Sequence, residues 1–203
     1  MQDVWIIETG VANIASLFAG FRRLGAAPAL TTDPDVVRTA DRVVLPGVGA
    51  FAAGVERLRT RGLVEPLRER IAADHPTLAV CLGLQLLCET SEESPGETGL
   101  GVVPAHVTRF GAGVRVPQFG WNRVEPGPGA PFLEPGFAYF ANSFRIDAAT
   151  LPAGFGVATA DHGGPFVAAL QRGGLLACQF HPELSGAWGQ ALLGRWLQGG
   201  ASC

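Results

Sequence analysis

The chain has 203 residues, of which 47% are hydrophobic and 16% are charged, and its formal net charge is −3. This length and apolar content predict a single domain over residues 1–203 that buries one full core. The weak, slightly acidic charge excludes a protein drawn to nucleic acid or to an anionic membrane surface by its overall field.

The chain carries no sign of a membrane span or a metal site. It has no run of the roughly 18 apolar residues that a membrane helix needs, and Met1 to Asp3 lead into a strand without a basic signal region. We therefore expect a cytoplasmic protein. The four cysteines, at positions 81, 88, 178 and 203, lack metal-ligand spacing and are expected to be free thiols. We expect no metal and no cofactor.

The first 90 residues predict strands that alternate with helices. Strands are expected at residues 4–7, 29–31, 42–45 and 78–80, with helices at residues 14–24, from 34, and from 51 to 71 with a break near Gly62. Asn13 is expected to cap the first helix. The spacing of Leu84, Leu87 and Cys88 extends a further helix through Cys88. This alternation predicts an α/β fold with a doubly wound, mostly parallel sheet and flanking helices, whose ligands gather at the carboxyl ends of the strands.

The second half of the chain has a different character. Residues 91–101 are polar and rich in glycine, and short apolar stretches separated by Gly and Pro follow from Val103. Strands at residues 138–140, 157–159, 166–170 and 175–180 predict a mixed or antiparallel extension of the sheet. The apolar residues between Trp188 and Leu197 predict a closing amphipathic helix that packs on the sheet.

Cys81 directly follows a predicted strand and begins a predicted helix. A tight turn at this point lifts the side chain out of the fold and directs the next backbone N–H, that of Leu82, to the same place. Such a position suits a nucleophilic thiol. A lone cysteine between apolar residues is more often a small buried hydrophobe, so the interpretation depends on a base, an orienting acid and an oxyanion hole elsewhere in the chain.

His181 and Glu183 follow the last predicted strand and flank Pro182. The proline favours an extended backbone at His181, so that both side chains can point to the same side. An imidazole held by a carboxylate is the base that a cysteine nucleophile uses. The alternative is a surface strand end with two polar residues.

The segment from Pro46 to Gly49 also follows a strand. Glycines on both sides of Val48 allow the backbone to approach a ligand and a peptide unit to rotate at low cost. Backbone amides of Val48 and Gly49, with that of Leu82, are the candidates for an oxyanion hole. A plain tight turn has the same pattern.

The loop from Pro46 to Phe51, the turn at Cys81 and the segment His181 to Glu183 together resemble the class I (triad) glutamine amidotransferases. Within that family, the stretches at residues 45–51, 61–63, 116–122 and 139–144 are most similar to the glutaminase subunits of imidazole glycerol phosphate synthase, which act in histidine biosynthesis. The resemblance covers essentially the whole chain and implies the family's α/β fold.

The resemblance also implies roles for individual residues. Cys81 attacks the side-chain amide of L-glutamine, His181 transfers the proton to the leaving ammonia, and Glu183 orients His181. The substrate's amino-acid end is held by Gln85, Glu93, Asn142, Ser143 and Phe144, and the partner interface with its ammonia gate involves Trp121, Asn122 and Asn13. Gln85 could instead face solvent on its helix, and Trp121 could be ordinary core.

The implied partner is a cyclase subunit, with which the chain forms a heterodimer. Ammonia passes to this subunit, which makes imidazole glycerol phosphate and AICAR. Docking of the partner is expected to rotate a peptide of the Pro46 to Gly49 loop, so that an N–H replaces a carbonyl at the site. The alternatives are a stand-alone cysteine γ-glutamyl hydrolase, another triad glutaminase subunit, and a non-catalytic interaction module.

Overall fold

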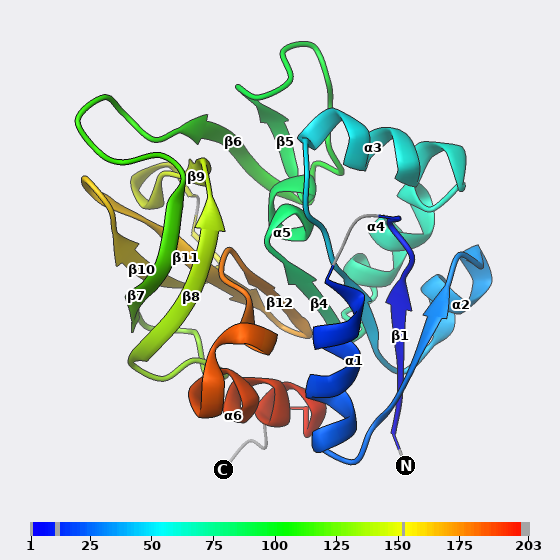
Figure 1. Ribbon diagram of the computed structural model, residues 1–203. Helices are drawn as coiled ribbons and strands as arrows, with labels where there is room; N and C mark the ends of the chain where they lie inside the picture. The colour runs from blue at the N-terminus through cyan, green and yellow to red at the C-terminus, as the bar shows by residue number, and fades with distance from the viewer. Residues whose placement is uncertain (1, 11–12, 152, 200–203) are drawn as a thin grey trace.

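The computed structural model describes residues 2–10, 13–151 and 153–199, with helices on both faces of a long central sheet (Figure 1). The strands of this sheet follow the order β2-β1-β3-β4-β12-β11-β10-β7-β8. Cys203 and the residues at 11 and 12, which separate Gly10 from Asn13, lie outside the described part of the chain.

One half of the sheet is parallel. It contains β1 (Asp3–Ile7), β2 (Ala27–Thr31), β3 (Val43–Leu45), β4 (Thr77–Val80) and β12 (Leu175–Cys178). The connecting helices are α1 (Ile14–Arg23), α2 (Pro34–Thr39), α3 (Phe51–Thr60) and α4 (Val64–Ala72). Asn13 caps α1 by accepting a hydrogen bond from the Ser16 amide, as expected. The break between α3 and α4 falls at Gly62, whose φ of 65° suits glycine.

The other half of the sheet is antiparallel, as the second half of the sequence predicts. It contains β11 (Pro165–Arg172), β10 (Gly156–Asp161), β7 (Gln118–Pro126) and β8 (Gly136–Asn142). A short helical turn (η2, Pro182–Leu184) and α6 (Gly186–Leu197) close the chain. The predicted doubly wound sheet with an antiparallel extension is therefore confirmed.

A second, three-stranded sheet was not predicted. It pairs β5 (Cys88–Ser91), β6 (Val103–Arg109) and β9 (Phe144–Ile146), and the turn η1 (Ala148–Thr150) follows it. The prediction of helix through Cys88 is wrong, because α5 spans only Leu82–Leu86 and Cys88 begins β5.

Two layers of apolar side chains hold the helices to the sheet. Residues Leu17, Phe21 and Trp196 of α1 and α6 pack on one face, with alternate strand residues such as Ile6 and Val44. The opposite face packs against α2 to α5 through Val37, Val55, Leu58, Leu67 and Leu84. Strand residues therefore alternate between the two layers, which is the pattern of a sheet covered on both faces.

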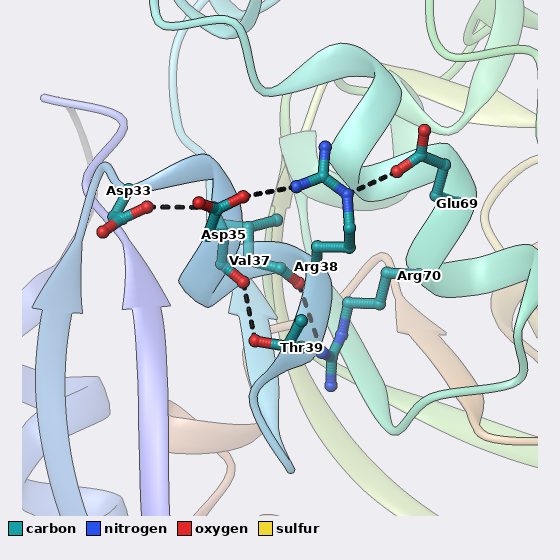
Figure 2. A network of polar contacts seen from close by, with 7 residues as sticks. All are labelled: Asp33, Asp35, Val37, Arg38, Thr39, Glu69 and Arg70. Atoms are coloured by element: carbon teal, nitrogen blue, oxygen red, sulfur yellow. Dashed lines mark hydrogen bonds and ion pairs between the residues drawn. The ribbon is translucent and has the colours of Figure 1, made fainter.

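Buried Arg70 ties α4 to the end of α2. Its guanidinium donates to the Val37, Ala40 and Pro76 carbonyl oxygens at 3.2, 2.6 and 2.7 Å. Figure 2 shows the contact between Arg70 and Val37 beside Arg38, which bridges Asp35 and Glu69 at the surface. Burial lowers the pKa of Arg70 to about 10, although the negative charge of Asp41 raises it.

Among the described residues, no helix has the length and apolar character needed to cross a bilayer. The division into one domain stays a prediction.

Candidate active site

The predicted catalytic segments follow three neighbouring strands and lie at one edge of the sheet. The Pro46 loop follows β3, Cys81 follows β4 and His181 lies beyond β12, and these strands are adjacent in the order β3-β4-β12. The strands are parallel, so their carboxyl ends lie together. This is the position at which an open α/β sheet binds its ligands.

Cys81 lies on the sharp turn that the sequence predicts. Its φ of 54° and ψ of −109° are unusual for a residue with a side chain, and the next residue begins α5. The turn requires glycine at position 83, because a Cβ there would lie 2.1 Å from the Leu45 carbonyl oxygen. A strained strand-to-helix turn of this kind presents its side chain to a reactant.

His181 and Glu183, the predicted base and orienting acid, are in contact. His181 Nδ1 lies 2.9 Å from Glu183 Oε1, and both side chains are buried. This contact leaves the other ring nitrogen, Nε2, for Cys81. The backbone at His181 is extended, as Pro182 predicts.

The surroundings of His181 alter its protonation. Burial lowers its pKa, but the hydrogen bond to Cys81 and then the hydrogen bond and charge of Glu183 raise it, with a net result of about 10. The ring therefore carries a proton at neutral pH. A protonated imidazole beside a cysteine stabilises the thiolate form, which is the nucleophile.

Buried Ser185 fixes the backbone on which His181 is carried. Its hydroxyl donates to the His181 carbonyl oxygen at 2.6 Å and accepts from the Tyr139 amide at 3.0 Å. The His181 amide in turn donates to the Tyr139 carbonyl oxygen at 2.9 Å. His181 is thereby attached to β8.

Most of the predicted site residues surround one cavity of about 260 Å³. Its lining includes the candidates for nucleophile, base, oxyanion hole and substrate binding: Val48, Gly49, Cys81, Leu82, Gln85, Glu93, Asn142, Ser143, Phe144 and His181. Glu183 lies behind His181. The structure thus brings together residues that are up to 133 positions apart, from Val48 to His181.

The oxyanion hole is not open at Leu82. The Leu82 amide donates to the Gly47 carbonyl oxygen at 3.2 Å, so the expected donor is occupied. Gly47 packs tightly against the turn at Cys81, because a Cβ at position 47 would lie 2.8 Å from Leu82 Cβ. Gly49 has a φ of +101°, which explains the glycine on the other side of Val48.

The predicted substrate residues are held by contacts within the chain. The Gln85 side chain is buried, which excludes the solvent-facing alternative, and its amide nitrogen donates to Gln179 Oε1 at 2.9 Å. Glu93 Oε2 accepts from the Phe51 amide at 2.7 Å and so caps α3. Asn142 Nδ2 donates to the Phe144 carbonyl oxygen at 2.9 Å, while its buried Oδ1 has no partner within the described residues.

The other described cysteines, Cys88 and Cys178, are free and fully buried. Burial raises the pKa of the Cys88 thiol, with a smaller contribution from Glu89. Burial, and then the charge of Glu183, raises the pKa of Cys178. Neither thiol lines the cavity, so Cys81 is the candidate nucleophile among the three.

The predicted interface residues lie apart from the cavity. Trp121 is 58% exposed, which excludes ordinary core. Asn122 donates to the Asp161 carbonyl oxygen. Trp121 and Asn122 both line a surface hollow of about 450 Å³. Asn13 acts here as the cap of α1.

Sequence reasoning missed Gln179. This residue is fully buried, accepts a hydrogen bond from Gln85 and donates its amide N–H to Cys81 Sγ at 3.7 Å. Its one sequence signal is a polar residue between the apolar strand ending at Cys178 and Phe180.

Comparison with known proteins agrees with this geometry. The family Glutamine amidotransferase class-I matches residues 6–197. The imidazole glycerol phosphate synthase subunit HisH of Moorella thermoacetica is 41% identical over 197 residues, covering 95% of this chain and 93% of the relative. The HisH subunit of Symbiobacterium thermophilum is 38% identical over 200 residues, covering 97% and 93%.

A longer relative and a solved structure extend the comparison. The chloroplastic imidazole glycerol phosphate synthase hisHF of Arabidopsis thaliana is 38% identical over 96% of this chain, which matches 34% of the relative. A crystal structure of a glutamine amidotransferase has a TM-score of 0.76 at 20% identity and covers 98% of this chain and 99% of its own, which supports the fold. The chain belongs to the class I glutamine amidotransferase family.

Proposed function

We propose that the chain is the glutaminase subunit of imidazole glycerol phosphate synthase and hydrolyses L-glutamine to glutamate and ammonia. The single observation that carries this proposal is the meeting of Cys81, His181 and the predicted substrate residues around one cavity, with Glu183 held against His181. The full-length similarity to HisH subunits supports the choice of this glutaminase over other triad enzymes.

The reaction follows from the arrangement of these side chains. The Cys81 sulfur attacks the amide carbon of the glutamine side chain and forms a C–S bond, while the carbonyl electrons move to oxygen. When the tetrahedral intermediate collapses, the C–N bond breaks and His181 gives its proton to the departing ammonia. Water then adds to the thioester with His181 as base, which releases glutamate and restores the thiol.

The cavity also offers groups for the substrate's amino-acid end. Asn142 Oδ1 is a buried acceptor without a partner in the described structure, and an ammonium group is a suitable donor for it. The carboxylate of Glu93 lines the same cavity and supplies the charge that favours an ammonium. We therefore assign substrate binding to Glu93 and Asn142, with Gln85, Ser143 and Phe144 completing the lining.

An exposed aromatic surface supports a protein partner. Phe119, Trp121 and Phe137 are 72%, 58% and 55% exposed, and Tyr139 packs between the first two with ring centroids 5.8 and 6.1 Å away. We call these four residues the aromatic patch. Exposed aromatic clusters are typical of protein interfaces, and we assign this one to the cyclase subunit, with Trp121 and Asn122 at the ammonia gate.

The proposal includes the assembly in which the chain works. Ammonia passes to the cyclase subunit of a cytoplasmic heterodimer, whose lyase reaction yields imidazole glycerol phosphate and AICAR. Asn13 is placed at the same interface. A non-catalytic module is disfavoured by the contact between His181 and Glu183, and the names of the relatives do not favour a stand-alone hydrolase.

A glutaminase assay tests the proposal. Glutamate formation by the purified chain is measured alone and after addition of the cyclase subunit with its nucleotide ligand, and we expect a large rise in the complex. Cys81→Ser should lower kcat by at least about a thousandfold, because the nucleophile is lost. His181→Gln should cause a similar loss, whereas His106→Gln, at an exposed position outside the cavity, should not.

Two results contradict the proposal in different ways. Full activity in Cys81→Ser shows that the thioester mechanism is wrong. High turnover by the isolated chain that the cyclase subunit leaves unchanged identifies a stand-alone hydrolase.

A further inference from the structure

Gln179 links the nucleophile to the substrate cavity through hydrogen bonds that the reaction above does not use. Its side chain is 0% exposed, between the end of β12 and the beginning of α5. Its amide nitrogen donates to Cys81 Sγ at 3.7 Å, and its amide oxygen accepts from Gln85 Nε2 at 2.9 Å. Gln85 Nε2 also donates to the Phe144 carbonyl oxygen at 3.4 Å.

The chain of contacts determines which way both amides point. The Phe144 carbonyl can only accept, so the Gln85 atom that faces it must be nitrogen. The Gln179 atom that faces Gln85 must then be oxygen. The nitrogen of Gln179, with its two hydrogens, is therefore the atom that faces the sulfur.

Gln179 and His181 both contact the Cys81 sulfur. His181 supplies a donor whose proton leaves during the reaction, whereas the amide N–H of Gln179 cannot lose its proton at any relevant pH. A hydrogen bond to sulfur is stronger when the sulfur carries charge. The contact consequently favours the attacking form and one orientation of the side chain.

We propose that Gln179 is a positioning residue, which holds Cys81 Sγ in its attacking orientation and joins that orientation to Gln85 in the substrate cavity. The proposal deepens the proposed glutaminase reaction and rests on it for turnover. Its first test does not need glutamine or a partner, so the two proposals can fail separately.

The first test is the rate of Cys81 alkylation by iodoacetamide in Gln179→Met, which keeps the side-chain length and removes both polar atoms. We expect the rate at pH 7 to fall roughly five- to tenfold, which corresponds to the loss of about one hydrogen bond. This variant leaves the titratable groups around the sulfur unchanged. These groups are His181 and Glu93, which line the same cavity as Cys81, and Glu183, which contacts His181.

Turnover separates positioning from a general loss of structure. In the complex with the cyclase subunit, Gln179→Met should lower kcat by a similar factor and leave KM for glutamine within about twofold, because Gln85 keeps its bond to Phe144. Gln171→Met is the matched control, since Gln171 is also buried but bonds to the Phe132 amide away from the cavity. It should change neither rate.

An NMR measurement covers the case in which Gln179→Met does not fold. The side-chain amide signals of Gln179 in the full chain should shift when Cys81 is alkylated, whereas those of Gln171 should not. An unchanged alkylation rate in folded Gln179→Met, or Gln179 signals that do not shift on alkylation, overturns the proposal.

Discussion

His181 holds the proton that the proposed reaction transfers, and its neighbours decide how firmly it does so. Burial alone lowers the pKa of the ring, yet the hydrogen bond to Cys81 and the contact with Glu183 outweigh burial and raise it to about 10. The proton on His181 therefore depends on the nucleophile itself. Removal of the Cys81 sulfur should therefore lower the pKa of His181.

Titration of the His181 ring by NMR tests this dependence. In the unmodified chain, the ring should remain protonated through neutral pH. In Cys81→Ala it should titrate at distinctly lower pH, because burial remains while the contribution of the sulfur is lost. A ring that titrates at the same pH in both proteins contradicts the assignment of the Cys81–His181 contact.

The raised pKa also has a consequence for stability. Between the unfolded value of 6.5 and the folded value of about 10, the folded ring binds a proton that the unfolded ring does not. The contribution of His181 to the free energy of unfolding is therefore complete below pH 6.5 and is lost as the pH rises toward 10. His181→Gln should remove this part of the pH dependence.

At the scale of elements, the loop after β3 contacts the turn at Cys81 that follows β4. The contact is a hydrogen bond from the Leu82 amide to the Gly47 carbonyl oxygen. The 3.2 Å hydrogen bond between them occupies the amide that an oxyanion needs. Rotation of the Gly47–Val48 peptide would free the Leu82 N–H and turn the Val48 N–H toward the same side. We predict that docking of the cyclase subunit produces this rotation.

Structures of the free chain and of the complex, both with glutamine bound, test the prediction. The free chain should retain the bond from Leu82 to Gly47, whereas in the complex both amides should face the substrate oxygen. Two free donors already in place without the partner would refute the prediction. The same result would leave the roles of Cys81 and His181 unaffected.

The limit of prediction from sequence is clear at α5. The spacing of apolar residues extends this helix to Cys88, but it ends at Leu86. The Leu100 amide binds the Leu86 carbonyl oxygen, and the amides of Val102 and Val103 bind that of Leu87. These partners lie more than ten positions along the chain, so no local pattern could reveal them.

The candidate site divides in the same way. Cys81 and His181 could be placed at one edge of the sheet because the strands before them were predicted, although β12 ends at Cys178 and not at residue 180. The roles of Gln179 and Ser185 could not be predicted, because they depend on contacts with Gln85 and Tyr139 across the sheet. Motif spacing predicts candidate reacting groups, whereas the contacts that orient their side chains are long-range.

At the scale of the whole molecule, the aromatic patch and the catalytic cavity share a strand. Tyr139 of β8 contributes its ring to the patch and its backbone carbonyl to the His181 amide. Its amide also binds the Ser185 hydroxyl that holds the His181 carbonyl. A partner bound to the patch would therefore contact the strand to which His181 is attached.

Truncation of the patch tests whether the cyclase subunit binds there. Trp121→Ala should raise the Kd for the cyclase subunit by roughly 30-fold or more, since a central exposed tryptophan is a typical hot spot. Leu30→Ala is the control, because Leu30 is 42% exposed on β2 at the opposite edge of the sheet. Titration calorimetry measures both, and equal Kd values for the two variants would exclude the patch as the docking surface. Partner-stimulated glutaminase activity in Trp121→Ala should recover at high concentrations of the cyclase subunit, since Cys81 and His181 are untouched by the substitution.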